Sequence, residues 1–412
     1  MIKRKVELLA PAGNFESMMA AIQGGADAVY FGIEQLNMRA RATMNFTLEN
    51  LGEVAQRCRK HNVKSYLTLN TILYNHDLSL MKRIVNEAVK HQISAVIVSD
   101  QAAIGYAASK GLPVHISTQI SISNIETVKF YAHFADVMVL ARELSMVQMK
   151  EITQAIQQEQ IKGPSGELVK IEVFAHGALC MAISGKCYLS LHTHNSSANR
   201  GVCIQNCRRT YEVKDRDEGH EFHIENEYIM SPKDLNTLPF LDQLLDTGVD
   251  VLKIEGRARA PEYVKAVTSA YKAAILAVQD GSFTQEKVDG WMQELEKVYN
   301  RGFWGGYYLG KQLGEWSDTY GSKATTKKIY LGKGVRFFPK LNVGEFKIEG
   351  HQFSKGDSLL VTGPTTGVLE FVAEEIRVAD QAVETVATGV ACSIKVPEKI
   401  RASDKLYKIV AA

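Results

Sequence analysis

The chain has 412 residues, of which 45% are apolar and 23% are charged. This length predicts at least two domains, and this composition is typical of a globular protein. The net charge of +2 excludes a chain that is basic throughout, so any site for a polyanion must be local. No apolar run approaches the roughly 20 residues that cross a bilayer, and the start, MIKRKVELLAPAG, lacks the apolar region of a signal peptide. We therefore expect a cytoplasmic protein.

The first part of the chain repeats one pattern: a short apolar run, a polar turn and an amphipathic segment. Nearly continuous apolar runs are typical of parallel strands that are buried on both faces. The eight predicted strands are Val6–Ala10, Ala28–Gly32, Lys64–Leu69, Ala95–Ser99, Pro113–Thr118, Val137–Ala141, Ile171–Ala175 and Val251–Glu255.

Most segments between these runs begin near Asn, Asp or Ser, and their apolar residues recur three and four positions apart, which predicts helices. The predicted helices are Asn14–Gly24, Leu51–His61, Leu78–His91, Gln101–Lys110, Ile125–Phe134, Ser145–Gln157, Leu235–Thr247 and Pro261–Gln279. Eight strand–helix units predict an α/β fold of the TIM-like (β/α)₈ barrel class over residues 1–280. An open doubly wound sheet is the alternative, but the chain has neither a G-x-G-x-x-G nor a Walker A loop.

The unit after the seventh strand carries an insertion at about residues 177–234. It contains a cluster of cysteines and then YEVKDRDEGHEFHIENEYIM, whose alternation predicts a hairpin. Loops after barrel strands emerge at the carboxyl end of the strands, where active sites lie. We therefore expect the insertion to be functional.

The sequence pattern changes after residue 280. Residues 281–326 combine a predicted helix, Gln285–Tyr299, with a connection rich in glycine and aromatic residues. From residue 327 to 412, short β-type runs alternate with turns that contain Gly, Asp or Pro. This pattern predicts a small C-terminal all-β barrel domain.

Four of the six cysteines, Cys180, Cys187, Cys203 and Cys207, lie within 28 residues. Four thiolates suit a tetrahedral zinc ion or an iron–sulfur cluster. The wide spacing is not that of a zinc ribbon and favours ligands that fold around a larger group. The alternative is a set of buried free thiols. Cys58 and Cys392 are isolated and are interpreted as core residues.

Polar residues at the predicted strand ends form a second group, which we expect to converge on one mouth of the barrel. His176 and Glu255 are the candidate catalytic residues. The alternative role for His176 is that of a hydrogen-bonding residue alone. Arginine suits a carboxylate or phosphate ligand. The candidate substrate-binding residues are Asn70, Gln119, Arg142, Arg257, Arg39 and Arg41. The alternative is a network of ion pairs at the rim.

Basic residues form a third group. Lys186, Arg200, Arg208 and Arg209 lie among the cysteines, and residues 319–344 contain six Lys or Arg and no carboxylate. We expect these four residues, together with Lys327 and Lys328, to bind an RNA backbone. Ordinary solvated surface is the alternative.

Five blocks carry a resemblance to a known family. They are HGALCMAISGKCYLS, SSANRGVCIQNCR, ELLAPAGNFESMMAAIQGGADAVYFG, STQISISN and DVLKIEGRARAPEYV. Together they resemble peptidase family U32 over nearly the whole chain. The family takes its name from members reported as collagenases. The resemblance implies instead oxygen-independent hydroxylation of tRNA wobble uridine to 5-hydroxyuridine, of a ribosomal RNA cytidine or of ubiquinone precursors.

The resemblance also implies a 4Fe-4S cluster on Cys180, Cys187, Cys203 and Cys207 and, for the RNA-acting members, prephenate as a co-substrate. These four positions match the tRNA-acting branch, since the ubiquinone branch places one ligand elsewhere. We therefore expect a tRNA wobble-uridine hydroxylase with tRNA and prephenate as partners. The alternatives are hydroxylation of ribosomal RNA, a U32-type peptidase, and a non-enzymatic scaffold that binds RNA or a second U32-type subunit. Against the peptidase, the chain has no HExxH and no G-x-S-x-G motif.

Overall fold

The computed structural model describes residues 4–40, 45–212, 228–310 and 314–412. Its larger part is a closed barrel of eight parallel strands, which confirms the predicted fold class. The barrel strands are β1 (Glu7–Ala12), β2 (Ala28–Phe31), β3 (Lys64–Leu69), β4 (Ala95–Val98), β5 (Val114–Ile116), β6 (Val137–Val139), β7 (Lys170–Ala178) and β9 (Val251–Ile254). Neighbours in this order pair in parallel, and β9 pairs with both β7 and β1, which closes the barrel.

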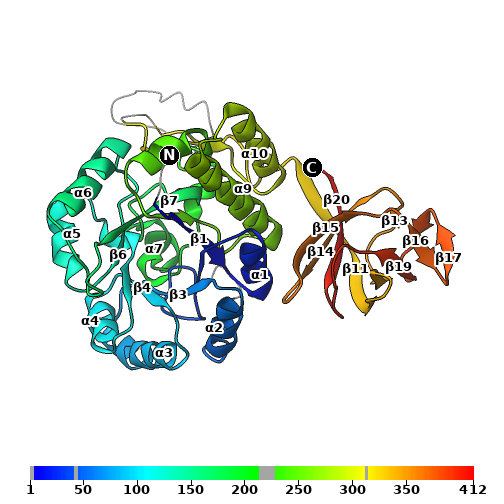
Figure 1. Ribbon diagram of the computed structural model, residues 1–412, viewed down its shortest axis with the longest axis horizontal. Helices are drawn as coiled ribbons and strands as arrows, with labels where there is room; N and C mark the ends of the chain where they lie inside the picture. Colours follow the sequence, from blue (N-terminus) through cyan, green and yellow to red (C-terminus); the bar gives the residue numbers. More distant parts are fainter. Residues whose placement is uncertain (1–3, 41–44, 213–227, 311–313) are drawn as a thin grey trace.

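Helices surround the barrel, as Figure 1 shows. The outer helices are α1 (Phe15–Gln23), α2 (Leu51–Lys60), α3 (Leu78–Lys90), α4 (Gln101–Ser109), α5 (Ile125–Ala132), α6 (Met146–Gln158), α8 (Leu241–Asp246) and α9 (Pro261–Asp280). Side chains of Asn14, Asp100, Asn124 and Ser145 accept hydrogen bonds from the first turns of α1, α4, α5 and α6. These caps satisfy donors that a helix leaves unpaired at its start, which is why the polar residues marked the starts in the sequence.

Two short strands flank the seventh barrel strand and correct one prediction. Strand β8 (Asp234–Asn236) pairs antiparallel with the end of β7, and β10 (Phe303–Trp304) pairs with β8. The predicted helix Leu235–Thr247 is therefore wrong in its first part, since Leu235 is in a strand and α8 begins at Leu241. Gly177 and Ala178 of β7 pair with Leu235 and Asp234. This strand pairing outweighs the apolar periodicity that predicted a helix from Leu235 onward.

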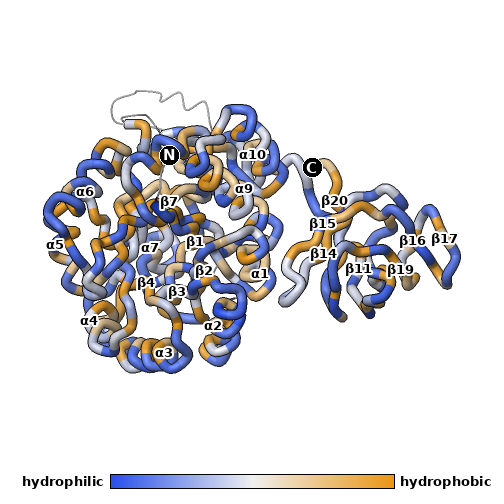
Figure 2. The backbone as a smooth tube through the Cα atoms, in the orientation of Figure 1, coloured by the Kyte–Doolittle hydropathy of each residue, from blue (hydrophilic) through white to orange (hydrophobic). Residues whose placement is uncertain are grey.

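The core lies mainly between the barrel and its helices. Apolar residues of both layers form one cluster, and a smaller cluster inside the barrel includes Leu9, Tyr30 and Ile97. In Figure 2 the strands at the centre carry much of the apolar sequence, whereas the outer helices mix apolar and polar positions. Among the described residues, no helix combines the length and the apolar character that crossing a membrane requires.

The C-terminal part is an antiparallel β region, as predicted. Helix α10 (Gln285–Lys297) precedes it, and Leu360 and Val368 of the β region belong to the same core cluster as the barrel. Its main sheet has the order β15 (Gly367–Val372), β14 (Ser358–Gly363), β20 (Lys405–Ala411), β11 (Thr326–Phe338), β12 (Val343–Ile348), β19 (Ala391–Lys395), β16 (Ile376–Val378) and β17 (Gln381–Val383). Two further strands, β13 (Phe353–Ser354) and β18 (Thr385–Val386), pair with each other.

The β region is attached to the barrel beside α1 and α9 (Figure 1). The Gln23 side chain of α1 donates to the carbonyl of Thr366 at 2.9 Å and accepts from the amide of Val368 at 2.9 Å. Lys265 of α9 donates to the carbonyl of Val368 at 3.0 Å. These bonds hold the turn between β14 and β15 against the barrel.

Candidate active site

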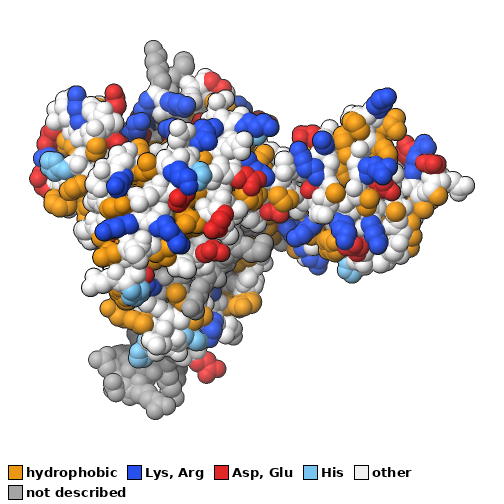
Figure 3. Space-filling view, turned by 90° about the horizontal axis from the view of Figure 1, so that it is seen from below, with side chains coloured by type: hydrophobic (Ala, Val, Ile, Leu, Met, Phe, Trp, Pro, Cys, Tyr) orange, Lys and Arg blue, Asp and Glu red, His pale blue; other side chains and the backbone are white. Residues whose placement is uncertain are grey.

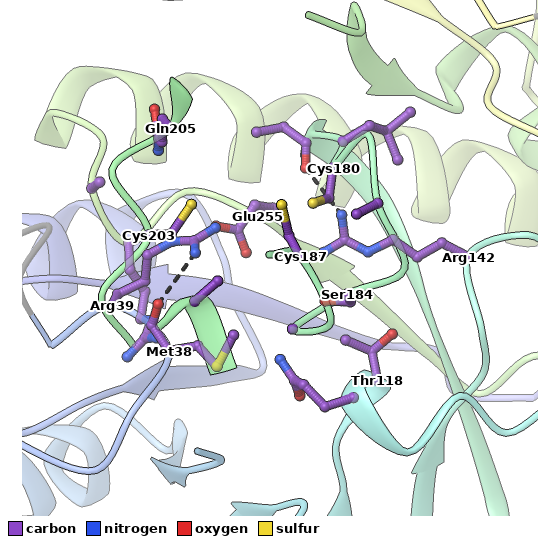
Figure 4. Close-up of a pocket in the computed structure, with 18 of the residues that line it drawn as sticks. Met38, Arg39, Thr118, Arg142, Cys180, Ser184, Cys187, Cys203, Gln205 and Glu255 are labelled. Carbon is purple, nitrogen blue, oxygen red and sulfur yellow. Dashed lines mark hydrogen bonds and ion pairs between the residues drawn. The ribbon is translucent and has the colours of Figure 1, made fainter. Parts of the chain in front are cut away.

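A cavity of about 790 Å³ lies at the carboxyl ends of the barrel strands. Tyr30, Thr68 and Ile97 of strands β2, β3 and β4 line its lower part, together with Phe174 and Lys253 of β7 and β9. The segment from Leu179 to Arg208, which follows β7, provides much of the remaining wall. Figure 4 shows the cavity with side chains from these two sources around one space. The insertion predicted from the sequence is therefore part of the barrel mouth.

Close backbone contacts dock this segment on the mouth. Gly201 has φ of +81°, and a Cβ atom there would lie 2.2 Å from the carbonyl oxygen of Asn37. Arg200 forms an ion pair with Asp77 and donates to the carbonyl of Ile72 at 2.7 Å. The amide of Ile72 in turn donates to the carbonyl of Asn199 at 3.1 Å. The loops after β2 and β3 thus fix the position of the cysteine-bearing segment.

All four clustered cysteines line the cavity as free thiols, and Cys180, Cys187 and Cys203 lie around the same space in Figure 4. Burial raises the pKa of Cys207, Arg208 lowers it, and the other three thiols raise it again because they lie nearby. In the part of the chain that the structure describes, no three His, Cys, Asp or Glu side chains are grouped to hold a single metal ion.

The other two cysteines are buried in the hydrophobic cores, as the sequence indicated. Cys58 belongs to the core of the barrel and Cys392 to the core of the β region. Burial raises the pKa of each thiol to about 12. They have no part in the cavity.

An ion pair between Arg39 and Glu255 crosses the mouth, with 3.1 Å between Nη2 and Oε1. Burial by itself would raise the pKa of Glu255, but Arg39, Arg142 and Arg257 together lower it to about 2. Glu255 is therefore a carboxylate at neutral pH and holds Arg39 in place. The pKa of Arg39 is raised, by Glu255 above all and also by Cys203.

Arg142 and Arg257, two of the predicted substrate-binding residues, have different surroundings. Arg257 is buried and donates to Asn37 at 3.0 Å and to Thr68 at 2.8 Å. Arg142 donates from Nη1 to the carbonyl of Ala178 at 3.0 Å and lies over the ring of Phe174, but its Nε is buried without a partner. A buried donor without a partner is costly unless a ligand accepts from it. Arg142 is thus the arginine best prepared for a ligand.

Asn70 and Gln119 are brought together as predicted. Asn70 donates to Ser117 at 3.1 Å and to the Oε1 atom of Gln119 at 3.4 Å, and it accepts from the amide of Met38. All four residues line the cavity. These residues form a polar wall of the cavity, and the Gln119 side chain lies close to Gly185 of the cysteine-bearing segment.

The wall of the cavity is strongly positive. Its described residues include eight cationic side chains and one carboxylate, Glu255. The cations are Arg39, Arg142, Lys186, Arg208, Lys253, Arg257, Arg259 and Arg301. Such a lining favours an anionic ligand.

Sequence reasoning missed several of these residues. Lys253 is buried on β9, donates to Glu172 at 2.6 Å and lies over the ring of Tyr30. A lysine inside a predicted buried strand was an available signal, since charged residues are rarely buried without a function or a partner. Arg259 and Arg301 come from later segments, and only the fold brings them to the mouth.

His176 does not lie where the prediction placed it. It is buried beside the rings of Tyr263, Tyr271 and Phe303 and is not among the residues that line the cavity. Burial lowers its pKa to about 3, and Arg259 contributes. In a regular strand, Phe174 and His176 would share one face, but the register of β7 is irregular between these two residues. Phe174 therefore lines the cavity, whereas His176 turns away from it, where the antiparallel partner β8 covers the end of the strand. Its position gives a general base no access to a ligand in the cavity.

The six residues predicted to bind RNA are divided by the structure. Lys186 and Arg209 are exposed, and Lys186 lines the cavity. Arg208 points inward and donates to the carbonyls of Leu179 at 2.6 Å and Pro232 at 2.7 Å.

The remaining predicted residues lie elsewhere. Arg200 is paired with Asp77 and stacks on Tyr74. Lys327 and Lys328 lie on β11 away from the cavity, and Lys328 is paired with Glu262. Arg41 and the core of the predicted hairpin, residues 213–227, lie outside the described residues.

Comparison with known proteins gives one family. The model described as peptidase family U32 matches residues 13–318, which include the barrel from α1 onward and the four cysteines. A protein of Porphyromonas gingivalis named collagenase is 57% identical over 402 residues, or 98% of this chain and 97% of its own length.

Two relatives at lower identity have names that refer to RNA. The tRNA hydroxylation protein P1 of Bacillus subtilis is 34% identical over 310 residues, or 73% of this chain and 70% of its own length. A 23S rRNA 5-hydroxycytidine synthase of Escherichia coli is 36% identical over 276 residues, or 66% of this chain and 40% of its own length. These names describe enzymes of more than one kind.

Proposed function

The chain belongs to peptidase family U32, and from this premise we propose that it is a cytoplasmic iron–sulfur RNA hydroxylase. Its proposed reaction converts the wobble uridine of tRNA to 5-hydroxyuridine without oxygen, with prephenate as co-substrate. The observation that carries the proposal is the cavity itself: among its described lining residues, four thiols and eight cations surround one space with a single carboxylate. A peptidase needs none of this combination.

The donor set of the four cysteines fits an iron–sulfur cluster. Cys180, Cys187, Cys203 and Cys207 would hold it, since all four are free and line one cavity. Arg39 interacts with Cys203 and Arg208 interacts with Cys207, so that cations offset the negative charge of thiolates. Such a cluster supplies one-electron redox chemistry when bound.

The other residues of the cavity would bind and orient a small dicarboxylate. Arg142 offers a buried donor without a partner, and Lys253 offers an ammonium group held by Glu172. Glu255 keeps Arg39 directed at the mouth through their ion pair. Two separated cationic groups suit a ligand with two carboxylates, such as prephenate.

Exposed aromatic side chains at the mouth support RNA as the larger substrate. Tyr188, next to Cys187, lines the cavity and is 75% exposed. Tyr74 is 52% exposed and carries the guanidinium of Arg200 at 4.3 Å from its ring centre. Proteins bind unpaired nucleotides by stacking bases on such rings and on arginine. A nucleotide of an anticodon loop is unpaired and can enter a cavity of this kind.

An anaerobic preparation tests the cofactor. The purified protein is expected to be brown, with charge-transfer absorbance and about four iron and four sulfide per chain. Cys203→Ala should lose this absorbance, whereas Cys392→Ala, a cysteine in the other core, should keep it. A colourless, iron-free wild-type protein would exclude the proposal.

Mass spectrometry of RNA tests the substrate. Deletion of the gene should remove 5-hydroxyuridine and its derivatives from bulk tRNA, and wild-type protein but not Cys203→Ala should restore them. Unchanged tRNA would contradict the proposed substrate. Loss of 5-hydroxycytidine from ribosomal RNA in the same strain would identify the second RNA as the substrate instead.

The name of the 57% identical relative favours one further candidate, a collagenase-type peptidase. A cysteine nucleophile would need a neighbouring base, and none of the described residues that line the cavity is a histidine. The peptidase hypothesis predicts that iron-free protein cleaves gelatin and that Cys203→Ala abolishes cleavage. Gelatin that stays intact with pure protein would rule it out.

A further inference from the structure

Three lysines lie directly opposite one another on neighbouring strands of the C-terminal sheet. Lys347 of β12 pairs in register with Lys333 of β11, and Lys333 pairs with Lys405 of β20. All three are exposed. Because neighbouring strands lie about 4.8 Å apart, the three Cα atoms span about 10 Å. We call these residues the lysine row.

The charge of the lysine row is only partly compensated. Lys333 forms an ion pair with Glu349 at 2.9 Å, and Glu349 also interacts with Lys347 at longer range. Among the described residues, no carboxylate lies within ion-pair distance of Lys347 or Lys405. Further along the same two strands, Arg336 stands opposite Glu345. Like charges that face each other across strands destabilise a sheet. A bound anion would relieve this repulsion.

The lysine row lies on the face of the sheet that meets the barrel. Side chains alternate along a strand, so Lys405 shares its face with Tyr407 and Ile409. Those two residues pack against the barrel core. Gln23 and Lys265 hold the neighbouring turn between β14 and β15. The lysine row is therefore held in a fixed position relative to the barrel.

On the face of the β region that Figure 3 displays, Lys and Arg side chains are more numerous than Asp and Glu. Lysine binds phosphate as a point charge, and an RNA backbone repeats this charge along its length. An acidic protein surface presents carboxylates without such a regular repeat.

We propose that the lysine row binds the phosphate backbone of an RNA whose reacting nucleotide occupies the barrel cavity. This inference rests on the proposed function and extends it, because it assigns RNA binding to the β region. The β region grips RNA outside the reacting loop, and the barrel carries out the chemistry. Phosphate contacts position the substrate without reading its sequence.

Binding of unmodified tRNA at several salt concentrations tests the proposal, with fluorescence anisotropy on the full chain. The variant is K333Q/K347Q/K405Q. The matched control is K60Q/K90Q/K110Q, which removes three exposed lysines near the ends of α2, α3 and α4. Loss of three phosphate contacts should weaken binding at least about 10-fold at physiological salt and lower the slope of log K against log salt by about 2. The control should change neither quantity.

The outcomes separate this inference from the proposed function. If both triple variants bind tRNA as tightly as the wild-type protein, the lysine row is not a binding site for RNA. The proposed function is unaffected by that result. An equal loss in both variants also overturns it, because net charge alone would then explain binding. Wild-type protein that binds no tRNA overturns both. The single variants K347Q and K405Q, each lowering the slope by about 0.7–0.9, provide the same test if the triple variant does not fold.

Discussion

Arg39 and Glu255 lie 216 positions apart in the chain, yet they form a 3.1 Å ion pair at the mouth of the barrel. Arg39 follows β2, and Glu255 directly follows β9. Strand β1 lies between these two strands and pairs with both. Closure of the barrel therefore creates the pair, and the pair in turn fixes the direction of one cavity arginine.

The first prediction concerns this pair. Glu255→Gln removes the carboxylate that offsets Arg39, Arg142 and Arg257. We expect the free energy of unfolding to fall by about 2 kcal/mol, because a hydrogen-bonded charge loses its partner. Urea denaturation measures the change. Glu143→Gln, at an exposed position, is the control and should leave stability unchanged. Equal stability of both variants would show that the pair does not contribute.

Arg208 gives a second prediction, because it connects the cysteine segment with its surroundings. Arg208→Gln removes donors to Leu179, Ser231 and Pro232. We expect faster limited proteolysis within residues 179–211 and about 10-fold weaker retention of the proposed iron–sulfur cluster, because residues that support metal ligands have effects of this size. Arg209→Gln is the matched control, since Arg209 is adjacent and exposed. Equal proteolysis of the two variants would contradict this role.

A third prediction concerns the docking of Gly201 on Asn37. Gly201→Ala adds a Cβ atom 2.2 Å from the carbonyl of Asn37 and forces alanine into φ of +81°. We expect a loss of about 2–3 kcal/mol in the free energy of unfolding, from strain and contact together. Gly111→Ala has φ of +69° and open space around it, so it isolates the backbone cost of about 1 kcal/mol. Equal losses in thermal or urea melts would exclude the close contact.

The fourth prediction concerns stability in acid. Burial lowers the pKa of His176 to about 3, whereas an unfolded histidine has a pKa near 6.5. Below about pH 6.5 the unfolded chain binds a proton that the folded chain does not bind. Stability is therefore present above that pH and falls by about 1.4 kcal/mol per unit as the pH decreases.

The measurement is urea denaturation between pH 7 and pH 5. In His176→Phe, the free energy of unfolding should fall less steeply with decreasing pH, by about 1.4 kcal/mol per pH unit. His133 is exposed, so His133→Phe should show the same pH dependence as the wild-type protein. His115 is also buried, with a pKa lowered to about 3 by burial and nearby lysines, so part of the decline should persist in His176→Phe. A decline that His176→Phe leaves unchanged would show that His176 is not buried as a neutral ring.

The barrel could be predicted because each of its units carries local signals. The apolar runs are long enough to fill a buried parallel strand, and Asn14, Asp100, Asn124 and Ser145 mark helix starts by capping them. The prediction failed at Leu235, where β7 supplied a strand partner from 58 residues earlier in the chain. The apolar periodicity of a segment does not indicate a strand partner that is distant in the sequence.

The cysteine cluster was also visible in the sequence, because four thiols within 28 residues are rare without a shared task. The directions of the side chains were not. Position at a strand end placed His176 with Glu255, yet the irregular register of β7 between Phe174 and His176 turns His176 into the aromatic core, whereas Glu255 lies at the mouth. Lys253, Arg259 and Arg301 reach the cavity only after the barrel has closed.

The sequence by itself therefore determined the fold class, the family and the place of the four cysteines, because these depend on local pattern and on short motifs. Tertiary structure alone decided which cations surround the cavity, which carboxylate holds Arg39, and that three lysines from β11, β12 and β20 form one row. Strand register and barrel closure set these contacts. Both are properties of residues far apart in the chain, so no local pattern encodes them.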